Sequence, residues 1–413
     1  MKSQAEAKVR VFALTWLSYA SYYLGRKGFS IVKAHLSDNY GISKRELGFI
    51  DTGYLAAYSL GQFVMGFAGD RIGSRRLLAL GMVAVAVCVA MFGLAKTTLL
   101  FFVFFTLNGF FQASGWPGNV KAMATWFSAT ERGKIMGAWS TCYQVGGLLA
   151  SAVATYLFKH YGWQSAFFVP AVFIALIGIL ILFSMPEKQA EPEVITAPVE
   201  LPDEAALASA LQSKWEIYKN PVIWSLGGAY FCLKLIRYSI LFWFPYYMTK
   251  VLGYAKDTAG YQSVSFEVGG VLGSIIVGWI SDRYFAGRRR QIAAVMTLAL
   301  AAALFSYVQL APLSKLLNFI GMAIVGFCLF GPDTLVSAAA AQDIGGKYNV
   351  AKAAGFINGV GSIGAIFQGL VTSEVSEKFG WNALFYLFVI MAVLSSVILL
   401  LGREKTQFAP LEP

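Results

Sequence analysis

The chain has 413 residues, of which 57% are hydrophobic and 13% are charged, whereas soluble domains are about 45–50% apolar and about 25% charged. An ordinary soluble fold is therefore excluded, and a helical membrane protein is expected. The formal net charge of +11 is better explained by basic cytoplasmic loops than by nucleic-acid binding. The four cysteines lie in apolar runs without neighbouring histidines, so we expect buried thiols and neither a metal site nor a cofactor.

Hydropathy divides the chain into twelve apolar segments, each long enough for a transmembrane helix of about 20 residues. Two of them begin near capping boxes, at residues 43–46 and 128–131, in which a Ser hydroxyl and a Glu carboxylate satisfy free N–H groups. Asn220 followed by Pro221 marks another helix start. We expect spans at residues 9–36, 46–69, 75–95, 98–121, 132–158, 163–184, 220–250, 258–281, 290–311, 315–341, 350–373 and 381–401.

A polar segment rich in proline separates six spans from six. The expected domains are an N-terminal six-helix bundle at 1–184, a cytoplasmic linker at 185–218 and a C-terminal six-helix bundle at 219–413. With both termini in the cytoplasm, twenty basic residues lie in inside segments and nine, Lys33 among them, in outside segments, as the positive-inside rule requires. We expect a multi-pass protein of a bacterial inner membrane with cytoplasmic termini.

The two halves of the sequence repeat each other. The run GFAGDR at 66–71 recurs as GWISDR at 278–283, and Arg26 and Arg237 occupy matching places in the first and seventh spans. This repeated run resembles the loop motif of the major facilitator superfamily, which implies an all-α membrane fold of two pseudo-symmetric bundles and favours a monomer. The residues expected to act as a conformational switch in these two loops are Asp70, Arg71, Asp282 and Arg283.

Charged residues inside the spans indicate the ligand. A basic residue at the centre of a span costs at least about 2.5–3.5 kcal/mol by insertion scales, so it usually faces a watery cavity. Four cations against three acids predict a positively charged cavity and an anionic ligand, and the guanidinium fork suits phosphate. The residues are Arg26, Lys27, Lys234 and Arg237, together with Asp51, Glu267 and Asp333.

Three stretches carry a closer resemblance: YYLGRK at 22–27, NGFFQASGWP at 108–117, and LIRY at 235–238 followed by WFP at 243–245. Through them the chain resembles the organophosphate:phosphate antiporter family along its whole length. The resemblance implies that an organophosphate is exchanged for inorganic phosphate by alternating access. It implies phosphate binding by Arg26 and Arg237, and a pocket lined by Tyr22, Tyr58, Gln62, Tyr143, Lys234 and Glu267.

The sequence departs from the glycerol-phosphate members of that family at four positions. Tyr143 stands where they have a histidine, Gln62 where they have a lysine, and Phe242 where they have an aspartate, while Lys234 adds a cation one turn before Arg237. The preference for an anion is kept, but the contacts to the organic part of the substrate differ. A hexose phosphate such as glucose 6-phosphate is therefore as good a candidate as glycerol 3-phosphate.

Several alternatives stay open. The arginines could instead pair with acids to hold helices together, Lys27 and Lys234 are candidates for substrate contact or for pairing with an acid, and Glu267 for balancing a lysine or carrying a proton. An enzyme is not expected, because no Ser, His and acid residues assemble into a catalytic group. The expected partners are a phosphorylated small molecule, inorganic phosphate and membrane lipid. A transporter-like sensor of external sugar phosphate and an exporter of another organic anion remain as alternatives.

Overall fold

The structure, a computed structural model, describes residues 2–127, 135, 139, 141–186, 220–284 and 289–402. Within these ranges the regular elements are all helices, and no strand occurs. In chain order they are α1 (Lys2–Tyr40), α2 (Lys44–Ile72), α3 (Ser74–Leu94), α4 (Thr98–Gln112), α5 (Gly115–Trp126), α7 (Thr141–Tyr161), α8 (Ser165–Ser184), α10 (Pro221–Lys250), α11 (Lys256–Gln262), α12 (Val264–Tyr284), α13 (Arg289–Leu310), α14 (Lys315–Thr334), the π-helical turn η2 (Leu335–Ala339), α15 (Ala340–Lys378) and α16 (Gly380–Leu401).

The helices follow the expected spans closely, and the predicted all-α fold of two six-helix halves is confirmed. Two spans are interrupted: Ala113 and Ser114 separate α4 from α5, and Ser263 separates α11 from α12. One expectation is wrong, because the loop predicted at 342–349 is helical and belongs to α15. That stretch holds a Gly-Gly pair, but it contains no proline and is flanked by alanines, the best helix formers.

Local sequence chemistry explains several helix ends. The capping box before α2 is formed: the Glu46 backbone N–H donates to Ser43 Oγ at 3.2 Å, and the Ser43 N–H donates to Glu46 Oε2 at 2.8 Å. At the start of α10 the N–H of Val222 donates to the Asn220 side-chain oxygen at 2.9 Å. The second predicted capping box, at 128–131, lies outside the described residues.

Eight helices in the described part of the chain are long and apolar enough to cross a membrane. Neither α1 nor α10 is among them. These two helices carry the intramembrane cations, Arg26 and Lys27 in α1 and Lys234 and Arg237 in α10. Helices α2 and α7 are also outside this set, so the feature particular to α1 and α10 is the charge in their middle parts, as expected of helices that line a polar site.

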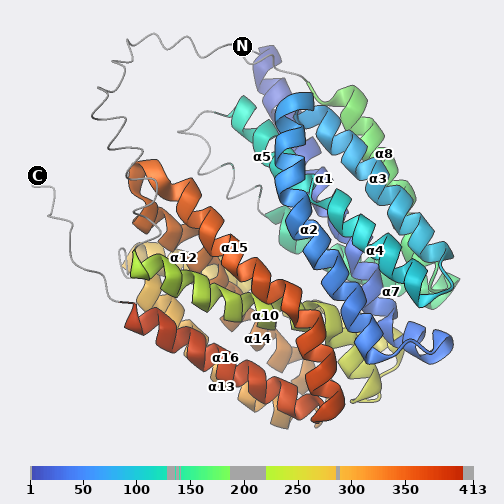
Figure 1. Cartoon of the computed structure of the whole chain (residues 1–413), viewed down its shortest axis with the longest axis vertical. Coiled ribbons are helices and arrows are strands. Elements are labelled where there is room, and N and C mark those ends of the chain that lie inside the picture. The colour runs from blue at the N-terminus through green and yellow to red at the C-terminus, as the bar shows by residue number, and fades with distance from the viewer. Residues whose placement is uncertain are drawn as a thin grey trace, which may run out of the picture. The chain divides into compact units, whose positions relative to one another are not determined.

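The chain packs as two compact units, of which unit 1 comprises Met1–Glu193, Ser239–Val268 and Ile366–Trp381. Within it α3 packs against α8, α2 against α4, and α1 against α7 (Figure 1). The segments from the second half of the sequence are joined to the first-half helices by contacts such as the ion pair between Lys159 and Asp257, 2.6 Å. Unit 1 is therefore completed by residues far along the chain.

Unit 2 comprises Val194–Tyr238, Gly269–Ala365 and Asn382–Pro413. In it α12 approaches α14 very closely through two glycines one turn apart. A Cβ atom added at Gly269 would lie 1.8 Å from the Ala323 carbonyl oxygen, and one at Gly273 would lie 2.3 Å from that of Phe327. Small residues at this spacing let two membrane helices pack backbone to backbone.

Candidate functional site

Arg26 and Lys27 are consecutive residues of α1 and so project from the helix in different directions. Lys27 is buried, and its ammonium donates to Oε1 of Glu267 at the start of α12. Arg26 is half-buried, with its guanidinium carbon 3.7 Å from the centroid of the Tyr23 ring, a cation–π contact. Glu267 thus balances a lysine, which was one of the two roles considered for it.

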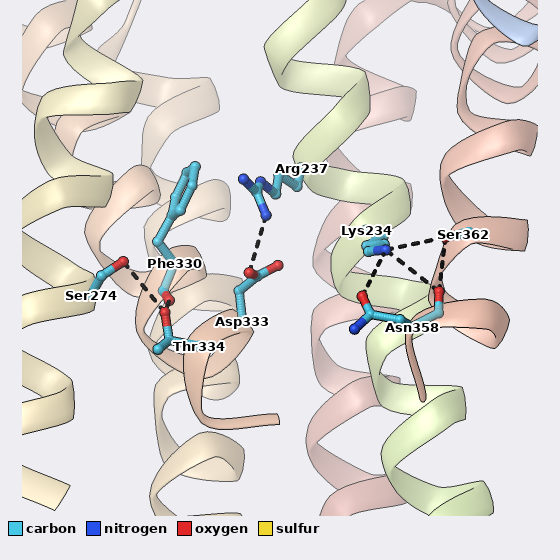
Figure 2. A network of polar contacts seen from close by, with 8 residues as sticks. All are labelled: Lys234, Arg237, Ser274, Phe330, Asp333, Thr334, Asn358 and Ser362. Carbon is cyan, nitrogen blue, oxygen red and sulfur yellow. Dashed lines mark hydrogen bonds and ion pairs between the residues drawn. The ribbon is translucent and has the colours of Figure 1, made fainter. Parts of the chain in front are cut away.

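Arg237 of α10 forms an ion pair with Asp333 of α14 (Figure 2). Its Nη1 donates to Asp333 Oδ2 at 3.0 Å, and its guanidinium carbon lies 4.4 Å from the centroid of the Phe330 ring. Asp333 is held one turn after Phe330, at the point where α14 gives way to the π-helical turn. A carboxylate and an aromatic face therefore orient the guanidinium. Arg237 thus forms the kind of acid pair that the sequence analysis considered as an alternative for the arginines.

Lys234 lies one turn before Arg237 and contacts a different helix. Figure 2 shows its ammonium directed at α15, where it donates to Ser362 Oγ at 3.2 Å and to Asn358 Oδ1 at 3.3 Å. The lysine side chain is buried, and the ammonium also lies 4.9 Å from the centroid of the Tyr230 ring. Lys234 is therefore anchored by neutral groups, whereas Arg237 is anchored by a carboxylate.

Two of the predicted tyrosines belong to an aromatic cluster in unit 1 that centres on Tyr19. The ring centroid of Tyr19 lies 5.2 Å from that of Tyr143, 5.4 Å from that of Trp139 and 5.9 Å from that of Trp116. Tyr22 is 6.4 Å from Tyr19. The sequence analysis singled out Tyr22 and Tyr143 but not Tyr19, although Tyr19 is one turn before Tyr22 and therefore on the same helix face.

Tyr22 is buried and held by polar and packing contacts within unit 1. Its hydroxyl shares a 2.8 Å hydrogen bond with Ser114 Oγ, and a Cβ atom added at Gly115 would lie 2.8 Å from its ring. Gly115 therefore leaves the space that the Tyr22 ring occupies. Tyr58 and Gln62, one turn apart on α2, are both half-buried, and Tyr58 packs on the buried group Met65, Leu77 and Ala113.

The first switch loop is a single residue, because α2 ends at Ile72 and α3 begins at Ser74. Gly73 between them has φ +80°, a conformation that favours glycine. Arg71 and Arg283 are both exposed at the ends of their helices. The side chains of Asp70 and Asp282 lie outside the described residues.

A buried ion pair between Lys33 and Asp51 escaped the sequence analysis. Lys33 was counted among the basic residues of the outside segments, whereas the structure shows its side chain fully buried in α1, which continues to Tyr40. Its ammonium also donates to the Phe242 carbonyl at 3.1 Å. The signal was available, because Lys33 follows Arg26 by seven residues and therefore lies on the same face of α1.

Comparisons with known proteins agree with this architecture. The family model described as Major Facilitator Superfamily matches residues 15–369 and 228–411. The chain is 32% identical to sugar phosphate exchanger 3 of Gallus gallus, over 95% of this chain and 91% of that protein. It is 30% identical to the glycerol-3-phosphate transporter of Bacillus subtilis (strain 168), over 95% of this chain and 92% of that protein.

The fold has a solved counterpart in a D-xylose-proton symporter, with a TM-score of 0.76 and 15% identity, covering 96% of this chain and 98% of that chain. At this identity the likeness concerns the fold alone. The predicted resemblance to organophosphate transporters is confirmed by the two relatives, which match nearly the whole chain. The family match, the twelve-helix fold and the charged α1 and α10 agree on one assignment: the chain belongs to the Major Facilitator Superfamily of membrane transporters and is not an enzyme.

Proposed function

We propose that this protein is a secondary transporter that exchanges an organophosphate for inorganic phosphate across the inner membrane by alternating access. The observation that carries the proposal is the charge of α1 and α10. In the described residues their membrane-spanning parts hold five cations, while three carboxylates pair with three different ones. Positive charge gathered on these two helices favours an anionic substrate such as phosphate. The pairs are Lys27 with Glu267, Lys33 with Asp51, and Arg237 with Asp333.

In this proposal the guanidinium groups of Arg26 and Arg237 bind the phosphoryl group, because their planar forks match its oxygens bidentately. Lys27, Lys234 and Glu267 contribute further charge, and Tyr22, Tyr58, Gln62 and Tyr143 complete the pocket. The relatives named sugar phosphate exchanger and glycerol-3-phosphate transporter support a phosphorylated substrate. A hexose phosphate such as glucose 6-phosphate and glycerol 3-phosphate are the two candidates.

The same charges explain why transport would be coupled exchange. Like charges repel strongly where the dielectric constant is low, so the empty carrier resists the conformation that brings its cations together. A bound phosphate dianion would neutralise these cations and shift the population toward the conformation through which the carrier passes from one side of the membrane to the other. The loop residues Asp70, Arg71, Asp282 and Arg283 would switch between the two states. The protein would act as a monomer with both termini in the cytoplasm.

The test is uptake of labelled inorganic phosphate into proteoliposomes of the purified protein. The vesicles are loaded with phosphate, glycerol 3-phosphate, glucose 6-phosphate or buffer alone. Uptake that requires an internal phosphate compound is the expected result, and the internal compounds rank the substrates. Binding of a sugar phosphate without flux would contradict transport and indicate a sensor. Neither binding nor flux would indicate an exporter of another organic anion.

A further inference from the structure

Lys234 is a buried cation with only neutral partners in the described part of the chain. Its ammonium donates to Ser362 Oγ at 3.2 Å, to Asn358 Oδ1 at 3.3 Å and to the Asn358 carbonyl at 3.5 Å. Hydrogen bonds from an ammonium to an anion are typically about 2.7–2.9 Å. These three contacts are longer, so they hold the ammonium in place and leave it able to bind an anion more closely.

No carboxylate among the described residues lies within 4.0 Å of the Lys234 ammonium. The acid of this network, Asp333, pairs with Arg237 instead (Figure 2). A buried charge without a counter-charge is unfavourable unless an opposite charge is supplied. Among the described residues Asp333 pairs with Arg237 and not with Lys234, so a ligand that brings a negative charge to Lys234 would complete the network.

The surroundings of Lys234 are built to keep it in this position. Asn358 and Ser362 are one turn apart on α15, and Ser362 Oγ donates to the Asn358 carbonyl at 2.8 Å. Between them Gly361 provides room: a Cβ atom there would lie 2.4 Å from the Tyr230 ring and 3.1 Å from Lys234 Cδ. Asn358 itself is exposed, so its amide N–H₂ group can donate to a ligand beside the ammonium.

We propose that Lys234, Asn358 and Ser362 form a subsite for a carboxylate on the phosphorylated substrate. The proposal rests on the proposed function, in which the arginines bind the phosphoryl group. Lys234 and Arg237 are three residues apart on α10, so their Cβ atoms are about 5–6 Å apart. That spacing suits the two acidic ends of a short phosphorylated carboxylic acid. A sugar hydroxyl would accept a hydrogen bond from Lys234 but would leave its charge uncompensated.

Glycerol 3-phosphate and 3-phosphoglycerate separate the two chemistries, because they share one skeleton and differ only in a hydroxymethyl group against a carboxylate. Each is used to inhibit phosphate self-exchange in proteoliposomes. For the unmodified protein we expect 3-phosphoglycerate to inhibit at a concentration at least about tenfold lower, since a site built for a charged partner rejects the neutral analogue. In Lys234→Met this ratio should fall toward one, measured on the phosphate self-exchange that the variant keeps.

A second variant keeps the lysine and changes its partner. Asn358→Asp supplies a carboxylate of nearly the same shape beside Lys234, so it should remove the preference for 3-phosphoglycerate by occupying the subsite. Lys121→Met is the matched control, because Lys121 is a helical lysine that also donates to a neutral oxygen, the Gly69 carbonyl at 2.8 Å. This control should keep the ratio of the unmodified protein.

Two results would overturn the subsite. One is equal inhibition by both compounds in the unmodified protein. The other is a loss in Lys234→Met that is as large for inorganic phosphate as for 3-phosphoglycerate, which would make Lys234 a phosphoryl ligand. If the unmodified protein shows no phosphate exchange, the proposed function has failed, and the subsite is then tested by thermal stabilisation of the purified protein with the same two compounds. A larger shift with glycerol 3-phosphate than with 3-phosphoglycerate would also exclude it.

Discussion

Lys33 and Asp51 form an ion pair in which both side chains have 0% exposure. The lysine comes from α1 and the aspartate from α2, and the ammonium donates as well to the Phe242 carbonyl of α10. The ammonium also lies 4.1 Å from the centroid of the Trp243 ring. Three helices of unit 1 therefore meet at one charge, and removing that charge leaves a buried carboxylate without its partner.

We expect Lys33→Met to lower the free energy of unfolding by about 3–5 kcal/mol, the usual cost of leaving one member of a buried pair. The double variant Lys33→Met with Asp51→Leu should regain most of this loss. The measurement is denaturation of the detergent-solubilised protein. As a control, Lys378→Met breaks an exposed pair with Glu374 and should cost less than about 1 kcal/mol. A loss in Lys33→Met no larger than in this control would contradict the prediction.

Arg237→Lys should reduce phosphate self-exchange at least about tenfold at equal reconstituted protein. Lysine can keep the ion pair with Asp333 but cannot present two parallel donors to a phosphoryl group. Arg45→Lys makes the same chemical change at an exposed pair with Glu374 and should leave exchange unchanged. Normal exchange in Arg237→Lys would remove this arginine from the phosphate site.

Gly269→Ala should destabilise unit 2 by about 1–3 kcal/mol or more, because its new methyl group would press on the Ala323 backbone. Gly278→Ala tests the same substitution on the same helix at a position with no described atom within 4 Å. There we expect a gain of about 0.4–1 kcal/mol, since alanine restricts the unfolded chain. Equal unfolding temperatures for the two variants would exclude the close packing of α12 on α14.

Asp38 gives the protein an acid-sensitive contact. Burial by itself would raise the pKa of its carboxyl, but the hydrogen bonds from Lys250 and Lys256 outweigh this and lower the pKa below its ordinary value of 3.8. The Asp38 carboxylate therefore takes up a proton less readily in the native state than in the unfolded state. Its ion pairs stabilise the native state at pH values above the ordinary pKa, and this stabilisation is lost as the pH falls through the lower native-state pKa.

The unfolding temperature of the unmodified protein should consequently fall more steeply below about pH 4 than that of Asp38→Asn. The effect should be small and should shrink in high salt, because both partners are partly exposed. Parallel curves for the two proteins across this range would show that the contact contributes nothing. The comparison is made by thermal unfolding in detergent at several pH values.

Most helix positions could be predicted because hydropathy marks each span. Arg26 and Arg237 could be singled out as candidate site residues because charged side chains within a span are rare. The break before Gly115 could not be predicted, because it depends on backbone geometry that hydropathy does not record. The helix through 342–349 was missed because this stretch is polar, although it lacks proline and is flanked by alanines. Lys33 was misplaced for a related reason. A lysine near the expected end of a span is usually solvated or reaches the interface, and only the fold brings Asp51 to it.

The partners of the site residues were harder to predict than the residues themselves. The sequence indicates that Arg237 lies in a span but not that Asp333 binds it, because the two are joined only by the packing of α10 on α14. Asn358 and Ser362 were missed altogether. Two polar residues at a spacing of four in a helix rich in glycine and alanine are a usable signal for a polar face, and it was not applied to this helix.

The make-up of unit 1 bears on how such a chain arose and how it assembles. The sequence repeat divides the chain into two similar halves, whereas unit 1 also takes in Ser239–Val268 and Ile366–Trp381 from the second half. The boundaries of the sequence repeat and the boundaries of unit 1 therefore do not coincide. During synthesis Ile366–Trp381 is translated close to the end of the chain, so final packing of unit 1 has to wait for translation of most of the second half.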